Sequence, residues 1–235
     1  MKITVGEDTL DFRVEYGKCQ KISIEMDHFG SVVVKAPDGT SEEAIVQGMT
    51  PHADSLIGRR KRIEALTQEP KERNYLEGEM FLYLGKEFPI KITVDESYKE
   101  NTVAFNGKEL HILSKSSDEQ VLRDSLKKFY FRSCKKLINN RVVHFQKEFQ
   151  IKPRSVEVNE SKLNWGMCTA ERKLTFNWRL IMAPEDVIDY IVIHEMCHML
   201  HMNHERSFWR LVGKLMPDYE KKQAWLAYKN PTMTL

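Results

Sequence analysis

The sequence predicts an α+β fold in which a strand-rich part precedes a mainly helical part. Apolar residues alternate with polar ones up to about residue 36 and again between residues 81 and 113, which is the period of half-buried strands. Beyond residue 118 apolar residues recur at three- and four-residue steps, which is the period of amphipathic helices. Because the polar segment 114–118 separates the two patterns, we expect domains over residues 1–115 and 116–235.

The first strand-rich segment has Leu10 and Phe12 alternating with polar residues, and a turn is expected over residues 27–30. A helix is expected over residues 41–66, with a break before Pro51 because proline lacks the backbone N–H that a helix interior uses.

A second set of strands is expected before the boundary, and no internal repeat is apparent. Asn106-Gly107 lies between two apolar runs and is typical of a two-residue hairpin turn. The expected strands are 81–84, 89–94, 103–105 and 110–113.

The second part begins with a long amphipathic helix from Asp118 to about residue 149, with an interruption expected near Asn139-Asn140. Short strands are expected at 155–158, around 164–168 and at 174–178. A helix begins at Pro184, a residue tolerated in a first helical turn, and two further helices follow.

The helix after Pro184 contains His194-Glu195-Met196-Cys197-His198. Histidines four residues apart lie on one face of a helix, one turn apart, so both imidazoles can reach one metal ion. For nitrogen ligands in a hydrolase this ion is most often zinc. Glu195 lies off that line but close enough to reach a metal-bound water, so the pattern indicates a general base.

Three residues compete for the third ligand position, namely His201, His204 and Glu205. One more helical turn would carry His201 about 5 Å beyond the ion. His204 follows His198 by six residues, as in His-Glu-x-x-His-x-x-Gly-x-x-His sites, and Asn203 can supply the turn in a left-handed conformation. We therefore expect His204 to be the ligand, with Glu205 as the alternative and His201 as a second-shell donor or a helix-end residue.

Composition is that of an ordinary globular protein of 235 residues, with 41% hydrophobic and 30% charged residues and a net charge of +2. This balance predicts neither a nucleic-acid nor a membrane partner, and the basic run 59–62 is interpreted as a solvated helix face. The N-terminus is charged where a signal peptide would be apolar, so we expect a cytoplasmic protein. The scattered cysteines, which favour reduced thiols, are Cys19, Cys134, Cys168 and Cys197.

Several motifs together resemble the YgjP-like family of zinc metallopeptidases, relatives of the SprT and WLM families. The resemblance implies a zincin-like C-terminal domain, zinc held by the helix with His194 and His198, and peptidase activity. Met167 departs from the family pattern, which usually has serine there. The motifs are Tyr83-Leu84-Gly85, Asn164-Trp165-Gly166-Met167-Cys168, Leu174-x-Phe176-Asn177-Trp178-Arg179-Leu180, Ala183-Pro184, His194-Glu195-x-x-His198, Met202-Asn203-His204 and Phe208-Trp209.

Three functions remain open at the level of sequence. The first is a zinc peptidase that binds an extended substrate beside a strand near Trp165 or Leu174. The second is a nucleoside triphosphate (UTP-type) pyrophosphohydrolase, in which Arg179 or Arg206 would stabilise developing charge. The third is a non-catalytic zinc-stabilised nucleic-acid-binding module using residues 59–62, but a structural zinc site has no need of Glu195 as a base.

Overall fold

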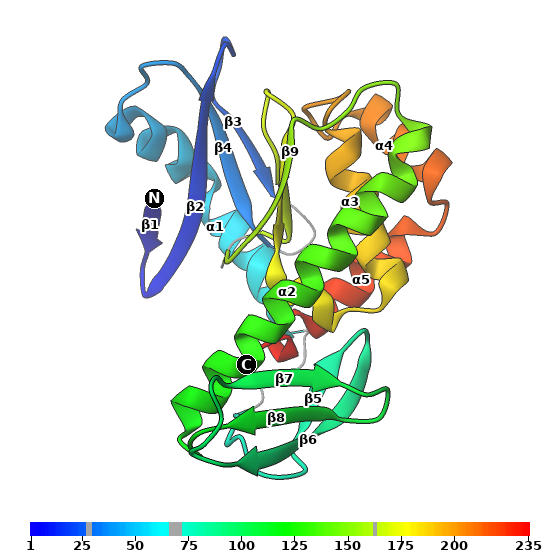
Figure 1. Cartoon of the computed structure of the whole chain (residues 1–235). Coiled ribbons are helices and arrows are strands. Elements are labelled where there is room, and N and C mark those ends of the chain that lie inside the picture. The colour runs from blue at the N-terminus through cyan, green and yellow to red at the C-terminus, as the bar shows by residue number, and fades with distance from the viewer. Residues whose placement is uncertain (27–29, 66–71, 162–163) are drawn as a thin grey trace. The chain divides into compact units, whose positions relative to one another are not determined.

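The computed structural model describes residues 1–26, 30–65, 72–161 and 164–235, and the side chains of residues 62–65 lie outside the description. The turn expected over residues 27–30 and the side chain of Arg62 therefore fall outside the described residues. Helices alternate with three small sheets (Figure 1), so the expected α+β class is confirmed. None of the described helices is long and apolar enough to cross a membrane.

The chain divides into two compact units. The first comprises residues 1–68 and 223–230, and the second comprises residues 69–222 and 231–235. Residues 69–115, which the sequence pattern assigned to an N-terminal domain, thus group with the helix that carries His194. That residues 116–235 fold as a domain of their own stays a prediction.

The first unit is built on one four-stranded sheet with the order β1-β2-β4-β3. Helix α1 contains Pro51 and continues through it, so the break expected there is not present. Alternating residues of the strands form the core together with one face of α1. The elements are β1 (Lys2–Val5), β2 (Asp8–Gly17), β3 (Ser23–Met26), β4 (Val32–Pro37) and α1 (Glu42–Ala65).

The second unit begins with a sheet of the same topology, in the order β5-β6-β8-β7. In both sheets the outer pairs are antiparallel, the central pair is parallel, and a long helix follows. The chain therefore repeats one strand arrangement that its residue pattern did not reveal. The elements are β5 (Met80–Tyr83), β6 (Lys86–Val94), β7 (Thr102–Phe105), β8 (Leu110–Ser114) and α2 (Glu119–Phe145).

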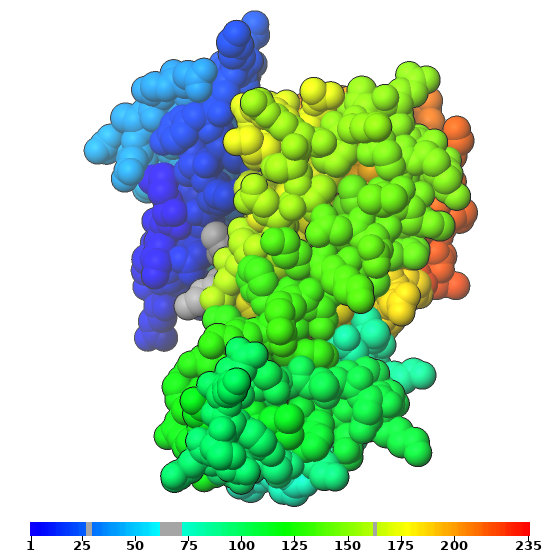
Figure 2. Space-filling model, viewed as in Figure 1, coloured from blue at the N-terminus to red at the C-terminus, as the bar shows by residue number. Residues whose placement is uncertain are grey.

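Helix α2 joins this sheet to the rest of the second unit (Figure 1). The Asp118 side chain caps it by accepting from the Val121 N–H, and the helix runs without a break through Asn139 and Asn140. Tyr130 donates to the carbonyl of Leu82 at 2.7 Å. Figure 2 shows the side chains of the sheet meeting those of α2 in one continuous surface.

A tight turn between β5 and β6 fixes the sheet to the helix with the histidines. Leu84 and Gly85 both have positive φ, 49° and 78°. The Leu84 N–H donates to the Ile181 carbonyl at 2.8 Å, and the Gly85 N–H donates to the Met182 carbonyl at 3.0 Å. A Cβ on Gly85 would lie 2.6 Å from Pro184 Cγ, so only glycine fits at this approach.

The remaining elements build the region around the histidines. A three-stranded sheet in the order β10-β11-β9 packs on α3, with β10 at its edge and β11 in its centre. The elements are β9 (Ser155–Asn159), β10 (Gly166–Cys168), β11 (Lys173–Asn177), the 3-10 helix η2 (Trp178–Met182), α3 (Glu185–Cys197), α4 (Arg206–Leu215) and the start of α5 (Tyr219–Lys229), whose residues from 223 on belong to the first unit.

Candidate metal centre

Helix α3 positions the histidines because it is buried on nearly all sides. Pro184 stands at its N-cap, and Glu185 and Asp186 lie in the first turn, where negative charge favours the helix dipole. Arg141 of α2 forms a bidentate ion pair with Asp189 and so ties the two helices together. The orientation of the last turn, which carries His194 and His198, is thereby fixed from several sides.

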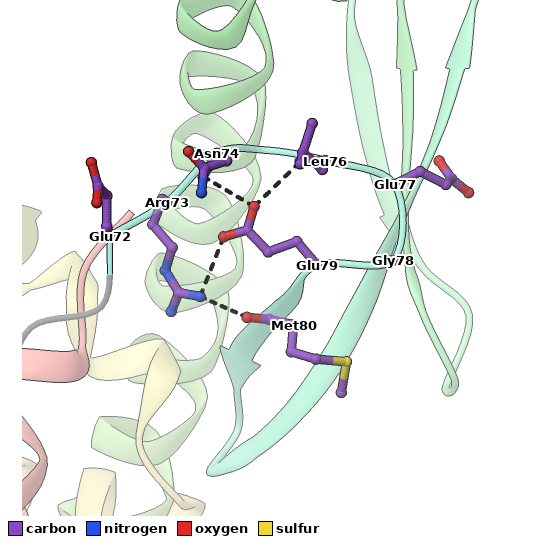
Figure 3. A pocket seen from close by; sticks show the side chains of 8 residues that line it. All are labelled: Glu72, Arg73, Asn74, Leu76, Glu77, Gly78, Glu79 and Met80. Carbon is purple, nitrogen blue, oxygen red and sulfur yellow. Dashed lines mark hydrogen bonds and ion pairs between the residues drawn. The ribbon is translucent and has the colours of Figure 1, made fainter.

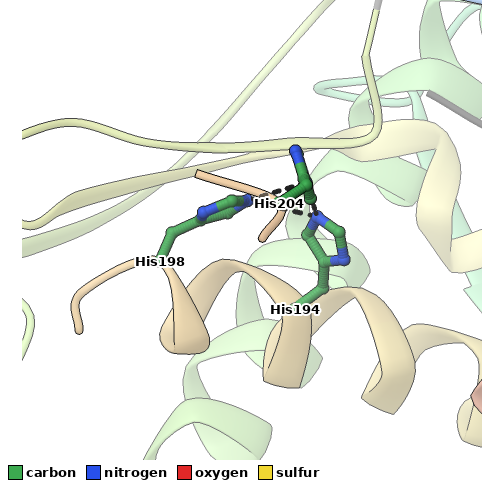
Figure 4. Close-up of side chains that lie close together, drawn as sticks. All are labelled: His194, His198 and His204. Carbon is green, nitrogen blue, oxygen red and sulfur yellow. Dashed lines mark hydrogen bonds between the residues drawn. The ribbon is translucent and has the colours of Figure 1, made fainter. Parts of the chain in front are cut away.

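Three imidazoles converge at the end of α3 (Figure 4). The Nε2 atoms of His194 and His198 are 3.3 Å apart, those of His198 and His204 are 3.2 Å apart, and those of His204 and His194 are 3.0 Å apart. Two nitrogens at about 2.05 Å from one tetrahedral zinc ion lie about 3.3 Å apart. The triangle of donor atoms therefore has the size that a single ion requires.

The opposite nitrogens of two of these rings have hydrogen-bond partners of their own. His198 Nδ1 lies 3.0 Å from the His201 carbonyl, and His194 Nδ1 lies 3.3 Å from the Tyr190 hydroxyl. A proton on each Nδ1 leaves a lone pair on each Nε2. In that tautomer the Nε2 lone pairs converge on one point, which is the arrangement of a metal site.

The chain reaches His204 by leaving the helix in ordinary turns. The N–H groups of Leu200 and His201 both donate to the Cys197 carbonyl at 3.0 Å. Asn203 has no positive φ, so the left-handed turn expected there is wrong. Among the described residues, the cluster of metal-ligand atoms contains neither the His201 ring nor the Glu205 carboxylate.

His201 and Glu205 have other positions. His201 is half-buried just beyond the end of α3, and it contributes its backbone carbonyl, not its side chain, to His198. Glu205 stands at the N-cap of α4. Three residues later, within that helix, the buried Phe208 ring contacts all three imidazoles, with centroid distances of 4.4 Å to His198, 4.8 Å to His204 and 4.9 Å to His194.

Glu195 is 5% exposed and lies directly against the backbone of β10. A Cβ on Gly166 would be 2.5 Å from Glu195 Cγ and 2.6 Å from its Oε1. Any larger residue at this position would require the Glu195 side chain or the strand to shift. The edge strand and the predicted base are therefore in contact.

Two cysteines lie near this carboxylate. Burial, and then the charge of Glu195, raises the pKa of Cys168 to about 12, and the same two causes raise the pKa of Cys197 to about 12. Both groups are neutral thiols at physiological pH. Among the described residues, neither sulfur atom belongs to the cluster of metal-ligand atoms, and neutral thiols fit the reduced cysteines that the sequence indicated.

The two arginines considered for phosphate contacts occupy different places. The Arg179 guanidinium lies 4.9 Å from the Trp165 ring centroid and donates to the Ser161 carbonyl, and burial lowers its pKa. Arg206 is the first residue of α4 and is exposed. The Asn177 side chain is 1% exposed and donates to the Ser161 and Asn164 carbonyls.

A separate pocket of about 570 Å³ lies in the segment before β5 (Figure 3), and none of the three histidines lines it. Arg73 and Glu79 point toward one another across it, 3.7 Å apart. Glu79 also accepts from the backbone N–H groups of Asn74 and Leu76. These bonds shape the loop, so the segment is a support for β5.

Three imidazoles at the end of one helix, with a glutamate between two of them in sequence, are typical of metal-dependent hydrolases. The chain matches the sequence model described as "YgjP-like, metallopeptidase domain" over residues 20–229. It therefore belongs to the YgjP-like family, and the predicted resemblance is confirmed.

Comparison with solved structures gives one weak similarity. The crystal structure of the metallopeptidase zymogen of Pyrococcus abyssi abylysin is 19% identical and covers 42% of this chain and 99% of its own, with a TM-score of 0.38. At that score the similarity supports no argument about this chain. The search of curated proteins found no match to this chain.

Two residues of the site were not predicted from the sequence, Tyr190 and Gly166. Tyr190 precedes His194 by four residues, so helical spacing alone places its hydroxyl on the histidine face. Gly166 was part of a recognised motif, but the reason for a glycine there lies in α3, which is distant in sequence. Spacing could have revealed Tyr190, whereas only the fold reveals Gly166.

Proposed function

We propose that the protein is a zinc metallopeptidase of zincin-like architecture, with His194, His198 and His204 as the metal ligands and Glu195 as the general base. Membership of a metallopeptidase family supports the peptidase class. The observation that carries the ligand set is the triangle of Nε2 atoms at 3.0–3.3 Å.

The donor set fits zinc. Three neutral imidazole nitrogens leave one position of a tetrahedron for water or substrate, as catalytic zinc sites do. Bound there, zinc would lower the pKa of a water molecule to about 7 and polarise a substrate carbonyl. Tyr190 and the His201 carbonyl hold the Nδ1 protons of His194 and His198, so that both Nε2 lone pairs face the ion.

Glu195 would handle the protons of the reaction. Its carboxylate would accept a proton from the attacking water and then pass that proton to the leaving amine. Because burial excludes most solvent and Gly166 restricts its position, the carboxylate is held in one place for both transfers.

Strand β10 is the proposed binding edge for substrate. It is the edge strand of its sheet and touches Glu195, whereas β11 is paired on both sides by β10 and β9. An extended peptide can add to an edge strand but not to a central one. This favours the location next to Trp165 over the one near Leu174 on β11, and it is the location that we propose.

The experiment is a parallel activity screen of the zinc-loaded wild-type protein against a peptide library and nucleoside triphosphates. The key variant is Glu195→Gln, which keeps nearly the same shape but cannot take a proton. We expect peptide cleavage by the wild-type protein and a loss of about 10²- to 10⁴-fold in the variant. Glu185→Gln is the matched control, because Glu185 is an exposed residue of the same helix.

The outcomes separate the open functions. Triphosphate cleavage without peptide cleavage, sensitive to Glu195→Gln, would replace the peptidase by the pyrophosphohydrolase. Full peptide cleavage by a purified Glu195→Gln protein would remove Glu195 from the mechanism. Zinc bound without any hydrolysis would favour the non-catalytic module.

A further inference from the structure

Positive charge is concentrated along helix α2 and its end. The chain as a whole is nearly balanced, with 36 lysines and arginines against 34 acidic residues. Residues 125–147 contain seven lysines and arginines and no acidic residue, between Asp124 and Glu148. A net charge of +2 therefore conceals a local segregation that composition alone cannot show.

Two of these seven cations are used within the fold. Lys127 pairs with Glu160 at 2.8 Å, and Arg141 pairs with Asp189. Four others are exposed on the same helix and, among the residues that the structure describes, make no ion pair. These four are Lys128, Arg132, Lys135 and Lys136.

The four side chains share one face of the helix. At 3.6 residues per turn their positions fall within an arc of about 100° and span about 12 Å along the axis. The opposite face is the buried one and packs into the core through residues such as Leu126, Tyr130 and Ile138. We call the row of Lys128, Arg132, Lys135 and Lys136 the basic row of α2. The exposed side of α2 is visible in Figure 2.

We propose that the basic row of α2 binds the phosphate backbone of a nucleic acid. The four cations lie on one exposed face within about 12 Å of helix, and each can contact a phosphate oxygen of a backbone that carries one negative charge per ~1.7 Å of duplex axis. The row has no exposed aromatic side chain and no amide at its centre, so the contact would be electrostatic and independent of base sequence.

Two other polyanions fit the row less well. A membrane-binding helix inserts an apolar face into lipid, but the apolar face of α2 is buried in the protein, and Val143 is the exposed large apolar residue on this helix. An acidic protein segment offers carboxylates at irregular spacing. Nucleic acid carries a dense, continuous line of phosphates, so each of the four cations can find a partner within the roughly 12 Å of the row.

The test is fluorescence anisotropy with a labelled 30-base-pair DNA duplex and the full-length protein, from 50 to 200 mM salt. Four phosphate contacts predict a slope of about −3.6 in log K against log salt, which is a weakening of about 100-fold over this range. The variant Lys128→Gln/Arg132→Gln/Lys135→Gln/Lys136→Gln should bind at least tenfold more weakly at 50 mM salt and show a shallower slope.

A matched control removes four exposed lysines from the β5–β8 sheet and its adjoining loops, by Lys86→Gln/Lys99→Gln/Lys108→Gln/Lys115→Gln. Both variants change the net charge from +2 to −2, and melting curves confirm that both fold. The control should bind the duplex within about twofold of the wild-type protein.

Three results would overturn the proposal. One is no duplex binding at 50 mM salt. Another is an equal loss in the two variants, which would mean that only net charge matters. The third is binding to vesicles containing 30% phosphatidylserine that depends on the basic row and exceeds binding to the duplex, which would assign the surface to anionic lipid.

Discussion

The carboxylate of Glu195 occupies the space that a side chain on Gly166 would need. Three atoms of Glu195 lie between 2.5 and 2.7 Å from the position of a Cβ on Gly166. This contact joins the edge strand β10 to helix α3, which carries His194, at the residue proposed as the general base. The position of the Glu195 carboxylate is therefore restricted by the backbone of β10 at Gly166 as well as by helix α3.

Gly166→Ala should impair hydrolysis while the metal is retained. The added methyl group forces Glu195 or β10 to move, and a displacement of about 1 Å at a catalytic group costs roughly 100-fold in rate. Peptidase kinetics and zinc content measured on the same sample check this. Gly17→Ala, at a position with open space around its Cβ, is the control. Unchanged kinetics in Gly166→Ala would show that the contact does not position the base.

Single alanine variants should separate the ligand from its neighbours. His204→Ala removes one of three donor atoms, so we expect the zinc content of the purified protein to fall sharply. His201→Ala should keep zinc, because His201 supplies a backbone carbonyl to His198 and the substitution leaves that carbonyl in place. Elemental analysis after dialysis measures both. Zinc lost from the His201 variant and kept in the His204 variant would reverse the assignment.

Local signals in the sequence predicted what depends on nearby residues. Helical spacing placed His194 and His198 on one face, and Pro184 marked the start of α3. The expected ligand His204 also lies in the cluster, although for a different local reason, since Asn203 does not adopt the left-handed conformation that we expected. Residue spacing thus predicted which histidines come together, but it did not predict the backbone conformation between His198 and His204.

Two features of the fold were not predicted, because one depends on side-chain hydrogen bonds within a loop and the other on a contact between residues far apart in the sequence. The Asn106-Gly107 pair does not form a two-residue hairpin turn. Instead the loop covers residues 106–109, because Asn106 Oδ1 accepts from the N–H groups of Lys108 and Glu109. The grouping of β5–β8 with α3 depends on Gly85 and Pro184, which no local pattern connects.

Gly85→Ala should destabilise the protein more than Gly78→Ala. Both glycines have φ near 80°, so alanine costs about 1–2 kcal/mol at each through its left-handed backbone. At Gly85 the new Cβ would also lie 2.6 Å from Pro184 Cγ and 2.9 Å from its Cα, whereas at Gly78 it would meet open space. Overpacking of this kind adds about 1–3 kcal/mol.

Urea unfolding of the two variants measures this difference in the free energy of unfolding. Equal losses would mean that the approach of Gly85 to Pro184 relaxes without cost. The turn would then not be what holds the β5–β8 sheet to the start of α3.

Tyr190→Phe should weaken metal binding without disturbing the packing. Tyr190 is 1% exposed, and its hydroxyl lies 3.3 Å from His194 Nδ1. The phenylalanine ring fills the same space but removes the group that orients the imidazole. Loss of such a partner typically costs 10- to 100-fold in metal affinity. Competition with a zinc chelator measures the dissociation constant, and melting of the metal-free protein reports on packing alone.

Tyr219→Phe is the matched control, because the Tyr219 ring stacks on Tyr190 with a centroid distance of 6.4 Å. If both variants bind zinc as tightly as the wild-type protein, the Tyr190 hydroxyl does not position His194. If both lose affinity alike, the effect belongs to the aromatic stack and not to the hydrogen bond.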